Sequence, residues 1–317
     1  MPDVVVIGAS AIDLKATAGA VLIPETSNPG VVSASPGGVG RNIAETLARL
    51  GSVVRLVSRV ADDAFGRLVL AETAAAGVDV SHVHTDAERT PTYVATLDVD
   101  GSLAVAVSDF AAIDTMTLEH LAPLSLDGVG HVVLDANLPI PVLSAALTRA
   151  GEAGALVTIE PVSVVKASRL VGLTRAYRAH LITPNEDEYA ALTALLDPHS
   201  LAANVCVRRG LAGSRLVRER ATAAVDIPAV RVPPEQVRDV TGAGDSATAG
   251  LIHALAHGAD LEDAVAFGHA VAARTVRSDL TVPTDLADLP ALPIPSTPID
   301  STPIDSTPST PTPREDT

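Results

Sequence analysis

The chain has very few aromatic side chains, since its 317 residues include three Tyr, three Phe and no Trp. It therefore lacks the stacking surfaces on which many proteins bind single-stranded nucleic acids. Basic residues are also scarce, because 22 Lys and Arg stand against 38 Asp and Glu, which gives a net charge of −16. A charge of this sign excludes sequence-independent binding to phosphate backbones. We expect no nucleic-acid partner.

The chain has one cysteine, Cys206, which excludes an intramolecular disulfide. The segment Asn204–Val207 is typical of a strand in which this thiol is buried and unreactive. Long apolar runs are also missing, because charged residues, Pro or Gly interrupt them before the roughly 18 residues that a membrane span needs. The N-terminus enters a strand-like run without the basic segment of a secretory signal. These features predict a cytoplasmic protein with no membrane partner.

Short aliphatic runs alternate with alanine-rich helical stretches, which is the pattern of βαβ units. A helix is predicted from about Gly40 to Gly51. The predicted strands are Val4–Gly8, Val53–Ser58, His131–Leu134, Leu156–Glu160, His180–Thr183 and Val205–Arg208. Parallel strands of this composition are buried on both faces by helices, so the pattern predicts a doubly wound α/β fold.

Three segments break this rhythm. Residues 15–35 and 90–108 are strand-like, and the second contains the turn signal Asp100-Gly101. Together they predict a small separate β-sheet that acts as a lid and shields a substrate from water. Residues 290–317 are rich in Ser, Thr, Pro, Ile and Asp and repeat Ser-Thr-Pro-Ile-Asp, which predicts a disordered tail behind a folded domain of residues 1–289. A partner-binding motif is the alternative for this tail.

The run Asp239-Val-Thr-Gly-Ala-Gly-Asp-Ser246 precedes a helix of small residues, Ala247–Ala256. Its glycines place bare N–H groups at a helix N-terminus, which suits an anion such as a transferring phosphoryl group. Asp245 would lie beside these donors and can accept a proton from an attacking hydroxyl. The alternative is a capping aspartate after a glycine turn.

The run Pro36-Gly-Gly-Val-Gly-Arg-Asn-Ile-Ala44 leads into the first predicted helix. Gly37 and Gly38 allow a ligand to approach the backbone closely. Asn42, one turn into the helix, can direct its amide toward sugar hydroxyls. A flexible loop with a polar first turn is the alternative, and the match to a dinucleotide-binding fingerprint is weak.

Other polar residues also follow predicted strands. Asn185 and Glu188 open a helix three residues apart and can orient Mg²⁺ through its water ligands, although a capping box explains the spacing better. Asp13, Asn137 and Glu160 lie near strand C-termini, the edge at which open α/β sheets bind ligands. The pair His253 and His257 lacks carboxylate support and is predicted to lie on a helix surface.

Together these segments resemble the ribokinase-like (PfkB) family of carbohydrate and nucleoside kinases, whose signatures are a glycine pair near the N-terminus and a Gly-Ala-Gly-Asp near the C-terminus. The resemblance covers about residues 3–285. It implies a three-layer α/β/α sandwich with a mainly parallel central sheet and a small β-sheet lid. It also implies ATP and Mg²⁺ as cofactors, a nucleoside or sugar as the substrate, and a homodimer joined through the lid. Some relatives bind a monovalent cation beside the anion hole, so K⁺ is a further candidate cofactor.

The resemblance also assigns roles to individual residues. Gly242, Ala243 and Gly244 would form the anion hole, with Asp245 as the catalytic base. Glu188 would hold Mg²⁺ through water, and Asp239 is the candidate ligand of the monovalent cation. The residues that would bind the substrate are Asp13, Gly38, Asn42, Asn137 and Lys166. The residues that would bind the nucleotide are Asn185, Glu188, Arg209, Gly210, Gly213, Thr241 and His269.

Within the family, the segments Ser27–Gly30, Ser35–Ala44 and Glu160–Lys166 look like those of pseudouridine kinases, which implies transfer from ATP to the ribose 5′-hydroxyl. Two residues depart from the family pattern. Glu160 stands where relatives commonly have Asp, and Arg208 is unusual before the loop Arg209-Gly-Leu-Ala-Gly213. A kinase for another nucleoside or sugar, and a non-catalytic binding protein, stay open as alternatives.

Overall fold

Alternate side chains of the first strand, β1 (Val4–Ile7), enter two different hydrophobic cores. Val5 and Ile7 pack in one core and Val4 and Val6 in the other, and all four are fully buried. A parallel strand covered on both faces requires such a continuous apolar run. These statements come from a computed structural model that describes residues 3–173, 177–286 and 289–292. The predicted tail of residues 290–317 lies almost entirely outside this range.

The described residues form a nine-stranded central sheet. Neighbouring strands pair in parallel from β11 to β5, and only β12 and β13 are added antiparallel at one end. The strands, in spatial order, are β13 (Val225–Ile227), β12 (Ser214–Arg218), β11 (Ala202–Arg208), β10 (Ala179–Ile182), β9 (Leu156–Glu160), β8 (His131–Asp135), β1, β4 (Val54–Ala61) and β5 (Asp79–Ala87). The predicted strands are thus confirmed, with boundaries that differ by a few residues.

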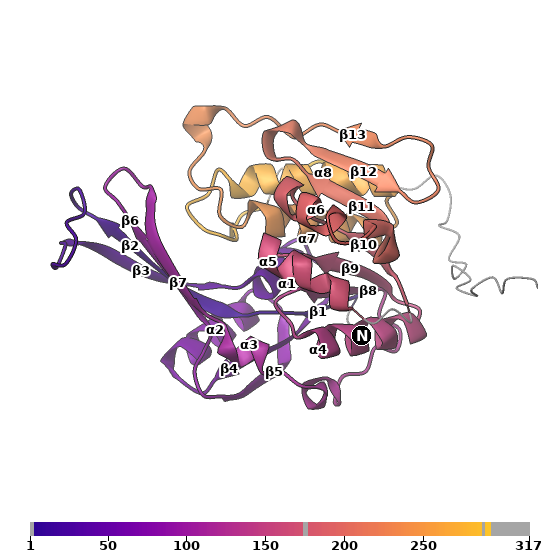
Figure 1. Cartoon of the computed structure of the whole chain (residues 1–317), viewed down its shortest axis with the longest axis horizontal. Coiled ribbons are helices and arrows are strands. Elements are labelled where there is room, and N and C mark those ends of the chain that lie inside the picture. The colour runs from indigo at the N-terminus through magenta and orange to yellow at the C-terminus, as the bar shows by residue number, and fades with distance from the viewer. Residues whose placement is uncertain (1–2, 174–176, 287–288, 293–317) are drawn as a thin grey trace, which may run out of the picture.

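Helices cover both faces of this sheet, which makes the three layers that the resemblance implies (Figure 1). One face carries α1 (Val39–Arg49), α7 (Ala243–Ala256) and α8 (Leu261–Thr275). The other carries α3 (Ala111–Asp114), α4 (Ile140–Glu152), α5 (Val164–Arg169) and α6 (Glu186–Thr193). Short 3-10 helices lie at η1 (Leu118–Leu121), η2 (Leu170–Gly172), η3 (Pro198–Ser200), η4 (Gly210–Ala212) and η5 (Pro234–Gln236).

A second, four-stranded sheet projects from one side of the body (Figure 1). Its strands, in spatial order, are β3 (Gly30–Gly37), β2 (Ala11–Ala18), β6 (Thr92–Leu97) and β7 (Leu103–Asp109). The predicted separate sheet is therefore confirmed, and Asp100-Gly101 lies in the turn between β6 and β7. Strand β2 begins at Ala11, earlier than expected from the sequence. Helix α2 (Ala64–Ala75) contacts both β2 and β3 at the base of this sheet.

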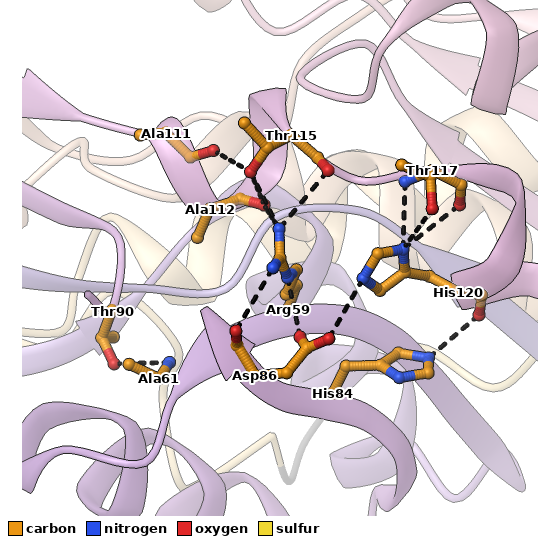
Figure 2. A network of polar contacts seen from close by, with 10 residues as sticks. All are labelled: Arg59, Ala61, His84, Asp86, Thr90, Ala111, Ala112, Thr115, Thr117 and His120. Carbon is orange, nitrogen blue, oxygen red and sulfur yellow. Dashed lines mark hydrogen bonds and ion pairs between the residues drawn. The ribbon is translucent and has the colours of Figure 1, made fainter. Parts of the chain in front are cut away.

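A network of polar contacts holds both ends of the β6–β7 hairpin on the body (Figure 2). Before β6, the Thr90 hydroxyl accepts a hydrogen bond from the Ala61 N–H at 3.1 Å. After β7, the guanidinium of Arg59 on β4 donates to the Thr115 hydroxyl at 2.8 Å and to the Ala112 carbonyl at 3.3 Å. Arg59 also pairs with Asp86 on β5 at 2.8 Å. The hairpin therefore starts and ends at fixed points.

Two predictions about single residues have different outcomes. Cys206 is buried in β11 as predicted, and burial raises the pKa of its thiol to about 11. The prediction that His253 lies on a helix surface is wrong, because α7 presents it to the core, where its Nδ1 lies 2.8 Å from the Ser52 hydroxyl. His257, one turn later, is exposed. Within the described ranges, no helix is both long and apolar enough to cross a membrane.

Candidate active site

Several polar side chains meet at the carboxyl edge of the central sheet. Asp135 ends β8, Glu160 ends β9 and Arg208 ends β11, while Thr183 directly follows β10. The N-terminus of α7 points at the same edge, since Thr248 in its second turn donates to Glu160 at 2.9 Å. Open α/β sheets bind their ligands at this edge.

The Gly-Ala-Gly turn begins α7 in a conformation that other residues resist. Gly242 is the N-cap of α7 and is left-handed at φ +76°. A Cβ on Gly244 would lie 2.9 Å from Nη1 of Arg208, so a side chain at this position would displace the guanidinium. The first N–H groups of α7 have no partner within the helix and lie at its positive end. The turn can therefore stabilise an anion.

Asp245 lies in the first turn of α7 and accepts a hydrogen bond from Nδ2 of Asn42, at 2.9 Å. This contact joins residues 203 positions apart and brings the two glycine motifs together at one site. Burial raises the pKa of Asp245 to about 7, and the charge of Glu160 acts in the same direction, while Asn42 and Arg208 oppose the shift. A carboxylate with a pKa near neutrality is suited to exchange protons with a substrate.

The glycine loop before α1 packs against the end of β1. Gly38 is left-handed at φ +93°, and a Cβ there would lie 2.6 Å from the Ala9 carbonyl oxygen. Asp13 on β2 lies beside this loop, because a Cβ on Gly37 would meet its carboxylate. Burial raises the pKa of Asp13 to about 6, against the charge of Arg41.

Asp135 organises this part of the site and was missed in the sequence. Its carboxylate is fully buried and accepts hydrogen bonds from the backbone N–H groups of Ala9 at 2.8 Å, Gly40 at 3.1 Å and Asn137 at 2.7 Å. It thereby joins the ends of β1 and β8 to the first turn of α1. Its position directly after the run His131–Leu134 was the available signal.

The sequence profile of the pfkB family carbohydrate kinases matches residues 1–285. The chain belongs to this family. Among individual pfkB kinases, it is 30% identical to "Pseudouridine kinase" of Escherichia coli, across 90% of this chain and 93% of that protein. It is 28% identical to "Guanosine-inosine kinase" of Exiguobacterium acetylicum, across 88% of this chain and 95% of that protein.

The fold agrees with that of solved pfkB-like kinases. A structure described as a carbohydrate kinase from Agrobacterium tumefaciens superposes with a TM-score of 0.74 at 30% sequence identity, over 89% of this chain and 93% of that one. The chain is therefore a phosphotransferase of the carbohydrate kinase class.

Arg208 and Glu160, the two residues that depart from the family pattern, contact each other. Nη2 of Arg208 donates to Glu160 at 2.7 Å, and Glu160 is 2% exposed. The other oxygen of Glu160 accepts hydrogen bonds from the hydroxyls of Thr183 at 2.8 Å and Thr248 at 2.9 Å. Arg208 also lies 3.7 Å from the buried Glu188 carboxylate. A buried ion pair thus lies beneath the first two turns of α7.

Asn185 and Glu188 form the capping box that their spacing favours. The Glu188 N–H donates to Oδ1 of Asn185 and the Asn185 N–H donates to Oε2 of Glu188, both at 2.9 Å. Burial raises the pKa of Glu188. The capping interaction uses Oε2 of Glu188. Carboxylate oxygens are also ligands that suit Mg²⁺ or its water molecules. Within the described ranges, no group of three or more His, Cys, Asp or Glu side chains is placed to hold a metal by itself.

The loop before α7 contacts the lid directly. Oδ1 of Asp239 accepts hydrogen bonds from the backbone N–H and the hydroxyl of Thr241, at 2.9 and 2.7 Å. Oδ2 of Asp239 pairs with the ammonium of Lys15 on β2, at 2.9 Å. The two residues are 224 positions apart, and no motif predicted that they would pair. The carboxylate predicted to hold a monovalent cation already faces a cationic side chain.

The remaining predicted residues lie in two groups. Lys166 lies 3.4 Å from Asp114 at the end of α3, and Asn137 is buried just after β8. Among the residues predicted to bind the nucleotide, Arg209 pairs with Asp226 at 2.8 Å, Gly210 begins η4 and Gly213 follows it, both glycines with positive φ angles. His269 lies 2.8 Å from the Ser214 hydroxyl and 2.9 Å from the Pro228 carbonyl, and burial lowers the pKa of its imidazole.

Proposed function

We propose that the protein is an ATP-dependent kinase that phosphorylates the ribose 5′-hydroxyl of pseudouridine and releases pseudouridine 5′-phosphate. The observation that carries the chemistry is the Asp245 carboxylate, which lies at the N-terminus of α7 and accepts a hydrogen bond from Asn42 in the first turn of α1. The similarity to "Pseudouridine kinase" of Escherichia coli supports the choice of acceptor.

In the proposed reaction, the 5′-oxygen attacks the γ-phosphorus of ATP while its proton passes to Asp245. The bond from the γ-phosphorus to the bridging oxygen breaks, and ADP leaves. The N–H groups of Gly242, Ala243 and Gly244 stabilise the charge on the transferring group. On the acceptor side, Asp13, Gly38 and Asn42 bind the sugar hydroxyls, with Asn137 and Lys166 at the edge of this pocket. Positioning and fixed donors provide most of the rate enhancement.

On the nucleotide side, Arg209, Gly210, Gly213, Thr241 and His269 bind ATP. Glu188 and Asn185 would hold Mg²⁺ through its waters, and Mg²⁺ would neutralise charge on the phosphates. The cytoplasmic location stays a prediction.

A panel of acceptors tests this function. Purified protein is incubated with MgATP and, in turn, pseudouridine, uridine, guanosine, inosine, ribose and fructose, and the phosphorylated product is measured by mass spectrometry. We expect the highest kcat/KM with pseudouridine. A higher kcat/KM with guanosine or inosine would contradict pseudouridine as the acceptor and favour the acceptors in the name of the Exiguobacterium relative. Absence of product with every acceptor would contradict a kinase function.

The contact between Lys15 and Asp239 leads to a prediction about monovalent cations. Because the Lys15 ammonium neutralises the Asp239 carboxylate, we expect the same kcat in KCl and in NaCl at equal ionic strength. Lys15→Met frees this carboxylate, and we expect turnover of that variant to become higher in KCl. Activation of the unmodified protein by K⁺ alone would show that Asp239 holds the cation despite Lys15.

We further propose that two copies pair through the lid. In the lid registers, Val32, Ala16, Thr96 and Val105 lie side by side across the strands, and Val107 shares their face. Val32, Val105 and Val107 are 70%, 57% and 64% exposed. Asp13 and Lys15 lie on the opposite face, toward the site. Light scattering measures the molar mass, and a dimer that dissociates in Val105→Glu would support this interface.

A further inference from the structure

Arg41, in the first turn of α1, carries a buried guanidinium to which the proposed function assigns no role. Its side chain is 5% exposed. It donates hydrogen bonds to the Pro36 carbonyl at 3.0 Å, to Oδ1 of Asn42 at 3.1 Å and to the Thr73 hydroxyl at 3.3 Å, and it pairs with Glu45. A cation buried to this extent needs such partners. Its contact with Asn42 links it to the reaction.

The Asn42 amide has a different partner at each end. Its oxygen accepts from Arg41 at 3.1 Å, and its nitrogen donates to Asp245 at 2.9 Å. If the amide rotated by half a turn, its NH₂ group would face the guanidinium and its oxygen would face the carboxylate. Both contacts would then be repulsive, because guanidinium has only donors and a carboxylate only acceptors. Arg41 therefore selects the orientation in which Asn42 donates to Asp245.

We propose that Arg41 is a positioning residue that fixes the Asn42 amide and, through it, the Asp245 carboxylate. Its importance for catalysis rests on the proposed function, whereas the relay itself is a property of the folded protein. Three charged groups on the central sheet also act on Asp245, namely Asp135 on β8, Glu160 on β9 and Arg208 on β11. These three stay unchanged in the variants below, so a change at Asp245 reports on the relay.

The test measures the ionisation of Asp245 directly, without substrate. Carbon-13 NMR of protein labelled at the Asp side-chain carboxyl group follows each carboxyl through a pH titration, and the Asp245 signal is the one missing from Asp245→Asn. In Arg41→Ala, we expect the pKa of Asp245 to rise by about one unit, because its ionised form loses a fixed donor. With the preferred acceptor, kcat should fall about tenfold, with a smaller change in KM.

Arg49→Ala is the matched control. Arg49 pairs with the same Glu45 carboxylate as Arg41, from the following turn of α1, and the hydrogen bonds to the Asn42 amide do not involve it. We expect Arg49→Ala to leave the Asp245 titration unchanged. In an Asn42→Ala background, the further change Arg41→Ala should add no shift, because the relay is already broken.

Three results would overturn the proposal: an unchanged Asp245 pKa in Arg41→Ala, an equal shift in Arg49→Ala, or a full shift that persists without Asn42. If Arg41→Ala fails to fold, Arg41→Met takes its place, because its longer apolar side chain fills more of the buried site and Glu45 keeps Arg49 as a partner at 2.6 Å. The NMR titration tests the relay independently of the kinase function. A protein without turnover in which Asp245 still responds to Arg41 would refute the function and support the relay.

Discussion

Replacement of Asp245 with Asn is expected to lower kcat by about 10²–10⁴-fold. The amide cannot accept the proton of the attacking hydroxyl, whereas the backbone donors of the Gly-Ala-Gly turn keep their positions. Nucleotide affinity should therefore change little, which calorimetric titration with ATP analogues measures. The folded protein should be as stable or more so, because an uncharged group replaces a carboxylate whose ionisation burial opposes.

The ionisation of Asp245 also predicts how the rate of the reaction changes with pH. Burial raises the pKa of Asp245 to about 7, and only the ionised form can accept a proton. In the unmodified protein, kcat/KM should thus increase with pH and reach its plateau above pH 7. In Asp245→Asn, the residual kcat/KM should no longer show this increase. The matched control is Asp263→Asn, the same change in the first turn of α8 at an exposed position. Turnover that survives in Asp245→Asn would rule out the proposed base.

Removal of Arg208 is expected to have the largest effect on stability. Arg208→Met leaves the buried carboxylates of Glu160 and Glu188 without the cation that lies 2.7 and 3.7 Å from them. Loss of one partner of a buried ion pair costs about 3–5 kcal/mol. The midpoint of urea unfolding, followed by circular dichroism, measures the free energy lost.

Two further variants control for this result. Arg215→Met removes an arginine from the neighbouring strand β12, where it pairs with Asp226 and both side chains are about half exposed. Because exposed pairs stabilise little, we expect this variant to unfold close to the unmodified protein. Adding Glu160→Gln to Arg208→Met should recover part of the loss, because one unpaired charge is then removed. An Arg208→Met variant as stable as Arg215→Met would show that the buried pair contributes nothing.

The strands of the central sheet could be predicted because burial on both faces leaves a local signature. The run His131–Leu134 is wholly apolar after its first residue, and the structure extends it only to Asp135. The start of β2 at Ala11 could not be read in the same way, because three residues separate it from β1 and no strong turn signal marks the change of sheet. The glycine motifs were visible because their backbone conformations require glycine.

The partners of the charged groups could not be predicted. Arg208 and Glu160 each appeared as an isolated departure from the family pattern, and only the parallel order of β9, β10 and β11 makes them neighbours. The same is true of Lys15 and Asp239, which meet only because the fold brings strand β2 of the lid beside the loop before α7. For Asn42, the sequence suggested an amide for sugar hydroxyls, and the structure adds its bond to Asp245.

The hydrogen bonds of Arg59 and Thr90 determine where the lid hairpin can bend (Figure 2). Because the residues that enter β6 and leave β7 are tied to strand β4, a swinging motion at the base would break several of these bonds together. We therefore expect any opening of the lid to occur by flexing of the paired strands beyond these anchors. Substitutions that stiffen or loosen β6 and β7 should thus alter the motion of the lid more than changes in the segments that connect it to the body.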